Sequence, residues 1–209
     1  MLALFGGTFD PVHLGHMETV AQLQKDLKID QIRWVLSAKP PHRSCPSATI
    51  EQRLAMLDIA LADYDQMFSD DVEVRRDKAS YTIDTLEYFR QQSHDASIIL
   101  IIGSDIMSSF DQWHRYQDIF KVANIIIMHR AGHEQTSTNV FTEYLTKDWN
   151  DLRLNTHGYV YLYPAPSISI SATQVREAIA SQLPDGKHEL ADWLHPKVLT
   201  FIQQNNLYA

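Results

Sequence analysis

Residues 1–16 of the chain, MLALFGGTFDPVHLGH, decide the class of fold. A short apolar run, Leu2–Phe5, predicts a buried strand, and Gly6 and Gly7 follow it directly. An amphipathic helical pattern begins at Gly15-His16. Two glycines allow a ligand to approach the backbone, and the free amide groups of a helix start attract an anion. We therefore predict an anion site immediately after the first strand of an α/β fold.

Strand and helix patterns alternate along the rest of the chain. The runs IILII (98–102) and IIIM (125–128) are apolar on both faces, as buried parallel strands require. The expected strands are Leu2–Phe5, Ile32–Leu36, Val72–Val74, Ile98–Ile102, Asn124–Met128 and Tyr159–Tyr163. The expected helices include Thr49–Tyr64 and Ser171–Gln182, each with a capping box, and Ala191–Gln204, with a break at Pro196.

This alternation predicts βαβ units with right-handed crossovers. We expect one domain over 1–209, a doubly wound, Rossmann-like α/β fold whose single parallel sheet is flanked by helices. Its C-terminal portion, about 171–209, should be helical. The polar segment 131–155 shows the weakest pattern and is expected to leave the sheet.

Composition excludes several classes of protein. The 209 residues are 44% hydrophobic, enough for a substantial core, and 18 basic against 26 acidic side chains leave a net charge of −8. A general nucleic-acid binder would carry a basic excess, so we expect no nucleic-acid partner. The single cysteine, Cys45, excludes an internal disulfide and a cysteine-based zinc cluster. No signal peptide and no apolar run near ~20 residues are present, so we expect a cytoplasmic protein without a membrane partner.

In a doubly wound sheet, ligands bind at the carboxyl ends of the strands, so the loops there carry the candidate residues. Most of these loops have an ordinary structural explanation when taken alone: a basic loop exposed to solvent, a helix cap or aromatic core packing. The segments are Lys39-Pro40-Pro41-His42-Arg43, Ser80-Tyr81-Thr82, Gly103-Ser104-Asp105, Trp113-His114-Arg115-Tyr116, Arg130 and Ile170–Arg176. In the last, capping explains Ser171 but not Arg176, so a phosphate site is favoured there.

Taken together, these segments resemble one family. GGTFDPVHLGH contains the H-x-G-H signature of the nucleotidyltransferase superfamily. With KPPHR, SYTIDTL, GSD, the Trp113 segment, Arg130 and ISATQVR in the same order, the chain is similar to bacterial nicotinate-nucleotide adenylyltransferases over nearly its whole length. It departs from many members at Ser37-Ala38, where they have an asparagine.

The resemblance implies a reaction in which the phosphate of nicotinate mononucleotide attacks the α-phosphorus of ATP and pyrophosphate leaves. His13, His16 and Arg176 would be the catalytic residues. The residues implied to bind ATP are Gly6, Gly7, Thr8, Phe9, His13, His16, Gly103, Asp105, Arg130, Ser171, Thr173 and Arg176. Those implied to bind the mononucleotide are Lys39, His42, Arg43, Tyr81, Thr82, Trp113 and Tyr116. Mg²⁺ would be carried by the ATP phosphates, without dedicated protein ligands.

Several alternatives remain at this stage. Within the superfamily, the acceptor could be nicotinamide mononucleotide or pantetheine phosphate, although KPPHR and SYTIDTL favour the nicotinate enzyme. From another class, the chain could be a non-catalytic nucleotide-binding module, but such a module would be expected to lose His16 or Arg176. The sequence leaves a homo-oligomer open.

Overall fold

The computed structural model describes residues 1–38, 45–76, 79–130, 139–166, 168–181 and 186–209. Strands and helices alternate in it as the sequence predicts. The strands are β1 (Leu2–Gly7), β2 (Gln31–Leu36), β3 (Met67–Asp70), β4 (Ile98–Gly103), β5 (Asn124–Arg130), β6 (Leu145–Thr146) and β7 (Val160–Ala165). The α-helices are α1 (Leu14–Leu27), α2 (Ile50–Leu61), α3 (Thr82–Gln92), α4 (Tyr116–Val122), α5 (Asn150–Leu154), α6 (Ala172–Ser181), α7 (Gly186–Trp193) and α8 (Pro196–Gln204). Two 3₁₀ helices, η1 (Ser104–Gln112) and η2 (Asn139–Tyr144), complete the description.

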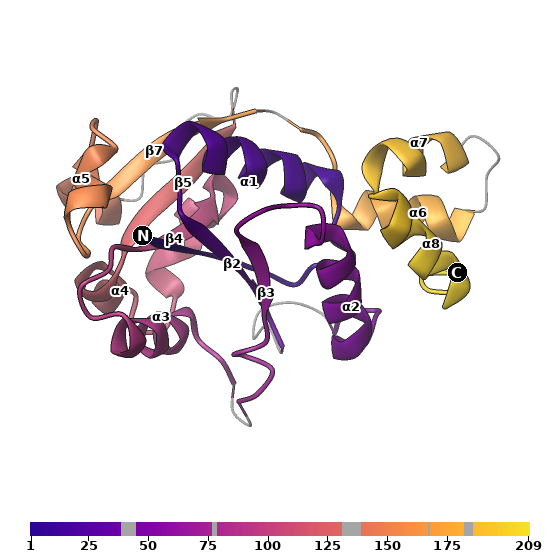
Figure 1. Ribbon diagram of the computed structural model, residues 1–209, viewed down its shortest axis with the longest axis horizontal. Helices are drawn as coiled ribbons and strands as arrows, with labels where there is room; N and C mark the ends of the chain where they lie inside the picture. The colour runs from indigo at the N-terminus through magenta and orange to yellow at the C-terminus, as the bar shows by residue number, and fades with distance from the viewer. Residues whose placement is uncertain (39–44, 77–78, 131–138, 167, 182–185) are drawn as a thin grey trace.

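The strands form one parallel sheet in the order β3-β2-β1-β4-β5-β7-β6 (Figure 1). The chain runs outward from β1 through β2 to β3, returns to the other side of β1, and continues from β4 outward. The direction of winding therefore reverses between β1 and β4, where Phe5 lies beside Ile101. The predicted doubly wound, Rossmann-like fold is confirmed, and its switch point lies beside the loop that follows β1.

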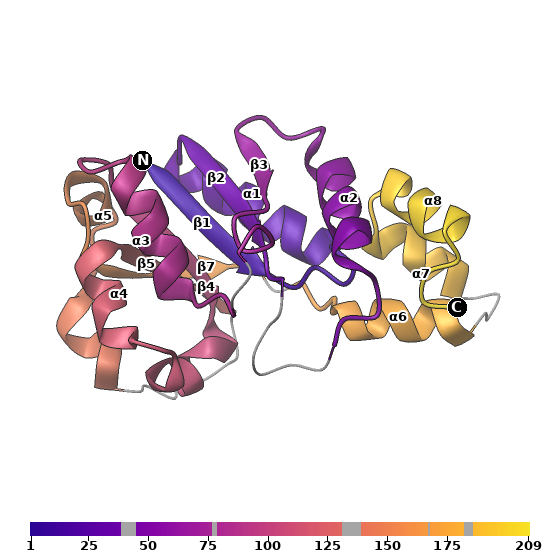
Figure 2. The same cartoon turned by 90° about the horizontal axis from the view of Figure 1, so that it is seen from below.

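Two hydrophobic clusters cover the two faces of the sheet. On one face, α1 and α2 pack against side chains such as Ala3 and Trp34, and on the other α3 and α4 pack against Leu4 and Leu100. Successive residues of β1 thus point to opposite clusters, as a strand buried on both faces requires. Figure 2 shows the same layers from below.

The three C-terminal helices lie together at one side of the sheet, next to α2 (Figures 1 and 2). Val175, Leu194, Val198 and Ile202 from this part belong to the same hydrophobic cluster as α1 and α2. The break at Pro196 is confirmed, because α7 ends at Trp193 and α8 begins at Pro196. The helical C-terminal end is therefore packed against the sheet domain through α1 and α2.

Two sequence predictions need correction. Val72–Val74 is not a strand; the third strand is Met67–Asp70, and a turn follows in which the Val72 amide donates to Asp70 Oδ1 at 2.9 Å. Val72 is apolar because its side chain is buried in the core cluster beside α3, not because it belongs to the sheet. The segment 131–155 does not leave the sheet entirely, since its residues 145–146 form the edge strand β6 beside β7.

Candidate functional site

A cavity of about 830 Å³ opens at the switch point of the sheet. It is formed by the loop after β1, the segment before α2, the ends of β4 and β5, η1 and the start of α6. Of the residues that the resemblance implies for ATP, those lining this cavity are Gly6, Gly7, Thr8, Phe9, His13, His16, Gly103, Asp105, Ser171, Thr173 and Arg176. Segments that are up to about 170 residues apart in sequence thus meet around one space, where the fold class predicts a ligand.

Two glycines that line this cavity, Gly6 and Gly15, leave space that a larger residue would occupy. A Cβ atom added at Gly6 would meet no atom within 4 Å and would project into open space. At Gly15, an added Cβ would lie 3.0 Å from the Nδ1 atom of His13 and 3.3 Å from the Cβ atom of Ile170. Gly15 therefore lets the start of α1 pack against both the His13 ring and the segment before α6.

The two imidazoles of the loop after β1 lie face to face. The ring centroids of His13 and His16 are 3.7 Å apart, with 26° between the ring planes. His13 is 4% exposed, and its carbonyl accepts the amide of His16 at 2.9 Å. The rings of Phe9 and His16 form a T-shaped pair, with centroids 5.5 Å apart and 82° between the planes. This packing restricts the orientation of both rings, as a site that positions donors against phosphate oxygens requires.

Arg176 from α6 lines the same cavity. Its Nη1 donates to the Asp10 carbonyl oxygen at 2.7 Å, and its Nη2 donates to the Thr173 hydroxyl at 3.2 Å. Ser171 and Gln174 form the predicted capping box. The backbone amide of Gln174 donates to Ser171 Oγ at 3.3 Å, and the backbone amide of Ser171 donates to Gln174 Oε1 at 2.9 Å. A guanidinium has more N–H donors than these two bonds use, so Arg176 can also bind an anion in the cavity.

Asp105 is exposed at the start of η1 and lines the same cavity. An added Cβ at Gly103 would lie 2.3 Å from Asp105 Oδ1, so only glycine leaves room for this carboxylate position. His129, at the end of β5, also lines the cavity although no sequence motif assigned it a role. In the sequence, the feature that marks His129 as a candidate is its position directly after the IIIM run (125–128).

Three comparisons relate this chain to known proteins. Residues 4–178 match the cytidylyltransferase-like family. The chain is similar to a Dechloromonas aromatica protein named probable nicotinate-nucleotide adenylyltransferase, with 35% identity over 217 residues, 99% of this chain and 97% of that protein. An Escherichia coli (strain SMS-3-5 / SECEC) protein of the same name is 37% identical over 212 residues, 99% of this chain and 97% of that protein. The chain belongs to the cytidylyltransferase-like family and, within it, to the nicotinate-nucleotide adenylyltransferases.

The fold comparison agrees with this family. The chain is similar to the structure of Plasmodium falciparum nicotinic acid mononucleotide adenylyltransferase complexed with NaAD, with a TM-score of 0.75 and 19% sequence identity. The comparison covers 99% of this chain and 96% of that one. At this identity the likeness concerns the fold, and the family resemblance suggested by the motifs is confirmed by the curated relatives.

Of the residues that the nicotinate-nucleotide adenylyltransferase resemblance implies for the mononucleotide, the described ones, Tyr81, Thr82, Trp113 and Tyr116, do not line the large cavity. Lys39, His42 and Arg43 lie outside the described residues. Tyr81 is the N-cap residue of α3 and Thr82 its first residue. For Arg130, the structure describes the backbone at the end of β5 and not the side chain.

The structure nevertheless brings the two aromatic segments together. The Tyr81 ring contacts the ring of His114, with centroids 4.3 Å apart and 36° between the planes. Trp113 and Tyr116 pack against Phe110 of the core, at centroid distances of 5.1 Å and 6.2 Å. His114 was not predicted to contribute, and its place between Trp113 and Tyr116 was the signal that could have identified it.

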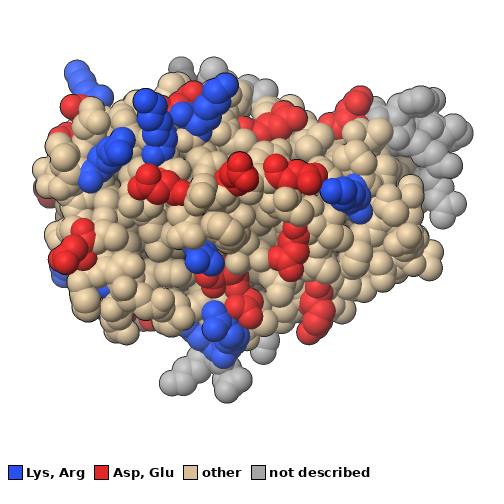
Figure 3. Space-filling model, viewed as in Figure 1, with Lys and Arg blue, Asp and Glu red and all other residues tan. Residues whose placement is uncertain are grey.

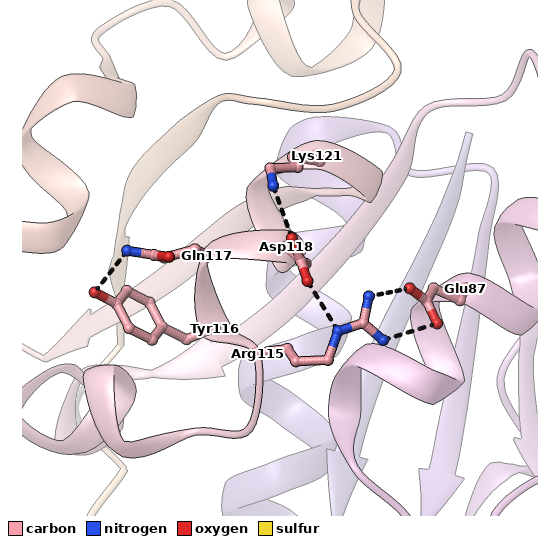
Figure 4. Close-up of polar contacts among 6 residues, drawn as sticks. All are labelled: Glu87, Arg115, Tyr116, Gln117, Asp118 and Lys121. Carbon is pink, nitrogen blue, oxygen red and sulfur yellow. Dashed lines mark hydrogen bonds and ion pairs between the residues drawn. The ribbon is translucent and has the colours of Figure 1, made fainter.

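An ion-pair chain ties these segments to each other (Figure 4). Arg115 donates from Nη2 to Glu87 Oε1 of α3 at 2.7 Å, and from Nε to Asp118 Oδ2 of α4 at 2.8 Å. The bonds to Glu87 and Asp118 raise the pKa of the Arg115 guanidinium. Tyr116 accepts a long hydrogen bond from Gln117 Nε2 at 3.4 Å. The start of α4 is thus held against α3 by exposed charges.

Arg53 supports the floor of the site, although it belongs to none of the sequence motifs. Its side chain is 1% exposed, and its Nη1 donates to the carbonyl oxygens of Thr8 and Ser37, both at 2.8 Å. Burial lowers the pKa of the Arg53 guanidinium, while the nearby Asp10 carboxylate raises it. The signal was an arginine on the apolar face of α2, between Ile50 and Leu57 in the helical repeat.

The described ranges contain neither a candidate metal cluster nor a membrane-spanning helix. Within them, no group of three or more His, Cys, Asp or Glu side chains is placed to hold a metal ion. None of the described helices is long and apolar enough to span a membrane. On the face shown in Figure 3, basic and acidic side chains are interspersed.

Proposed function

We propose that this chain transfers the adenylyl group of ATP to nicotinate mononucleotide, forming nicotinate adenine dinucleotide and releasing pyrophosphate. The observation that carries this proposal is the match to nicotinate-nucleotide adenylyltransferases over 99% of the chain at 35–37% identity. The cavity at the switch point supports it, because eleven residues implied for ATP line one space.

The reaction exchanges one phosphorus–oxygen bond for another. An oxygen of the mononucleotide phosphate bonds to the α-phosphorus of ATP, and the bond from that phosphorus to the bridging oxygen of the β-phosphate breaks. Because a phosphate monoester is already a nucleophile, the protein needs no nucleophilic side chain. Its task is to hold two anions in line and to neutralise charge that develops on the leaving group.

In this proposal, the imidazoles of His13 and His16 contact the ATP phosphates, with His16 nearest the transferred phosphorus. Arg176, with the hydroxyls of Ser171 and Thr173, holds the β- and γ-phosphates, since all three groups lie at the start of α6. The backbone at Gly6 and Gly7, with Thr8 and Phe9, forms the wall against which the triphosphate lies.

The remaining ATP contacts follow from the ends of β4 and β5. Asp105 accepts a hydrogen bond from a ribose hydroxyl, and Gly103 and Arg130 line the adenine side. Mg²⁺ would be carried by the phosphates of ATP and would supply charge neutralisation there. Arg176 and the imidazoles contact the phosphate oxygens directly.

The mononucleotide half of the proposal rests on the family resemblance and on the contact between the α3 and α4 segments. Tyr81, Thr82, Trp113 and Tyr116 bind the pyridine ring and its carboxylate. Lys39, His42 and Arg43 are also assigned to the mononucleotide, on the resemblance alone. The proposal includes a cytoplasmic location, because both substrates are small soluble nucleotides.

One assay tests the reaction class and the acceptor together. The protein is mixed with ATP and Mg²⁺, and each separate reaction receives one acceptor. The acceptors are nicotinate mononucleotide, nicotinamide mononucleotide and pantetheine phosphate, and the release of pyrophosphate is measured. We expect release with nicotinate mononucleotide above all. Release only with pantetheine phosphate would contradict the acceptor, and ATP binding without release for any acceptor would indicate a nucleotide-binding module.

A further inference from the structure

Tyr208 connects the segment after α8 to the loop after β1. Its hydroxyl donates a hydrogen bond to Asp10 Oδ1 at 2.8 Å, although the two residues are 198 positions apart in sequence. None of the sequence motifs described above gives Tyr208 a role. Neither Tyr208 nor its neighbours after α8 line the cavity. Its contact to Asp10 is therefore an indirect connection to the site.

Asp10 collects hydrogen bonds from three segments. It is 6% exposed, and its carboxylate also accepts the amides of Ser47 at 2.8 Å and Ala48 at 3.1 Å. Its carbonyl oxygen accepts Arg176 Nη1 at 2.7 Å. We call Asp10, Tyr208, Arg176 and the amides of residues 47–48 the Asp10 network. Its members fix the loop after β1 relative to α2, α6 and the segment after α8.

The backbone around Tyr208 is held in an uncommon conformation. Asn206 and Tyr208 have φ values of 49° and 65°, in the left-handed region that residues other than glycine seldom adopt. The Tyr208 ring packs against the same hydrophobic cluster as α2 and α8. Burial and the hydrogen bond to Asp10 raise the pKa of the Tyr208 hydroxyl, which therefore stays protonated and able to donate at neutral pH.

We propose that Tyr208 is a positioning residue for the triphosphate end of the cavity. Its hydroxyl fixes the carboxylate of Asp10, and the Asp10 carbonyl fixes the guanidinium of Arg176. Arg176 is thereby oriented before ATP arrives, so less ordering is needed when the β- and γ-phosphates bind. This inference rests on the proposed function, which identifies the ligand as ATP. Tyr208 affects the binding of its β- and γ-phosphates.

The chain offers a matched control. Tyr163 in β7 is 4% exposed, and its hydroxyl donates to Asp26 Oδ2 at 2.6 Å. Neither residue lines the cavity. Tyr163→Phe therefore removes the same kind of tyrosine–carboxylate hydrogen bond as Tyr208→Phe, at a place where no ligand contact is expected. Any loss common to both variants reports stability alone.

The experiment measures the dissociation constants of ATP and AMP for the parent, Tyr208→Phe and Tyr163→Phe by calorimetry. AMP has the adenosine and α-phosphate groups but lacks the β- and γ-phosphates. We expect Tyr208→Phe to raise the dissociation constant of ATP about three- to tenfold, as one indirectly acting hydrogen bond allows, and to leave that of AMP unchanged. Tyr163→Phe should change neither constant.

A second measurement tests the route through Arg176. In the Arg176→Ala background, Tyr208→Phe should weaken ATP binding less than it does in the parent, because both changes act on one set of contacts. Pyrophosphate release should follow binding, with a lower kcat/KM for ATP in Tyr208→Phe and an unchanged KM for the mononucleotide.

The outcomes separate this inference from the proposed function. Equal losses of ATP and AMP binding, or identical behaviour of Tyr208→Phe and Tyr163→Phe, would overturn the positioning role. Fully additive effects with Arg176→Ala would overturn the route through that residue. A parent that binds ATP but releases no pyrophosphate contradicts only the proposed function, whereas a parent that does not bind ATP contradicts both.

Discussion

The two ends of the proposed site are built differently. At the triphosphate end, buried polar groups connect distant segments, as in the bonds from Arg53 to Thr8 and from Tyr208 to Asp10. At the pyridine end, exposed Arg115 joins α3 to α4, and the rings of Tyr81 and His114 are in contact. Exposed ion pairs contribute little to stability, whereas a buried polar group that loses its partner is costly.

This difference indicates how each end works. A group undergoing phosphoryl transfer must be held in line, so the protein fixes its donors in advance through buried hydrogen bonds. A ring and a carboxylate can be bound by segments that adjust. Changes at the triphosphate end should therefore lower turnover, and changes at the pyridine end should alter the choice of acceptor.

The largest effect is expected at His16. In the proposed reaction, charge develops on the phosphates mainly during transfer, so we expect this donor to stabilise the transition state more than bound ATP. His16→Ala should bind ATP nearly normally and turn over at least ~100-fold more slowly, the usual consequence of losing a preorganised donor. Single-turnover kinetics and ATP calorimetry measure the two quantities, and near-normal turnover would remove His16 from the mechanism.

The pyridine end should discriminate between the acid and amide forms of the acceptor. Backbone amides of the first turn of α3, the Thr82 hydroxyl and the positive end of the helix dipole suit a carboxylate. An amide would instead present its own NH₂ donor to them, and a buried unpaired donor costs ~1–3 kcal/mol. We expect at least ~100-fold higher kcat/KM for nicotinate than for nicotinamide mononucleotide.

The comparison uses both mononucleotides at one fixed ATP concentration. Equal kcat/KM values for the two mononucleotides would show that the pyridine end does not determine the choice of acceptor. In that case the chain would remain an adenylyltransferase for pyridine nucleotides without a preference for the acid.

A moderate effect is expected at Asp105. If its carboxylate accepts a hydrogen bond from a ribose hydroxyl, Asp105→Ala should raise the KM for ATP roughly tenfold. Replacing ATP by 2′-deoxy-ATP should then cost less in the variant than in the parent, because both changes remove one contact. If the penalties of Asp105→Ala and of 2′-deoxy-ATP add fully, Asp105 does not contact the ribose and serves only at the start of the helix η1.

The smallest effect concerns pH and stability at Glu73, in the connection before α3. Burial raises the pKa of its carboxyl from 4.5 to about 7, while the hydroxyl of Thr85, which donates to Glu73 Oε1 at 3.0 Å, lowers it. The folded state therefore binds the proton more tightly than the unfolded chain. The stability from this group is complete below pH 4.5 and is lost as the pH rises through about 7.

Glu73→Gln keeps an oxygen that accepts from Thr85 and cannot titrate. Relative to this variant, the parent should lose about 1–2 kcal/mol of unfolding free energy between roughly pH 5 and pH 8. Urea unfolding at several pH values measures it. Parallel pH profiles for parent and variant would show that Glu73 does not titrate in this window.

Much of the fold was predictable from short stretches of sequence. IILII and IIIM could be placed as central strands because both of their faces are apolar, and the capping boxes at Thr49 and Ser171 locate the starts of α2 and α6. The third strand was misplaced because Phe68 is 42% exposed on an edge strand while Val72, in a turn, is buried. Apolar residues mark burial and only indirectly mark the strand itself.

The sequence by itself therefore determined the class of fold, the loops that line the cavity at the switch point and the family, because backbone preferences and motif spacing are local properties. Only the tertiary structure decided that Arg53 supports the loop after β1, that His114 meets Tyr81, and that Tyr208 reaches Asp10. These contacts join groups far apart in sequence. Which donor meets which acceptor depends on how the helices pack against the sheet, and that packing is a property of the whole core rather than of any segment.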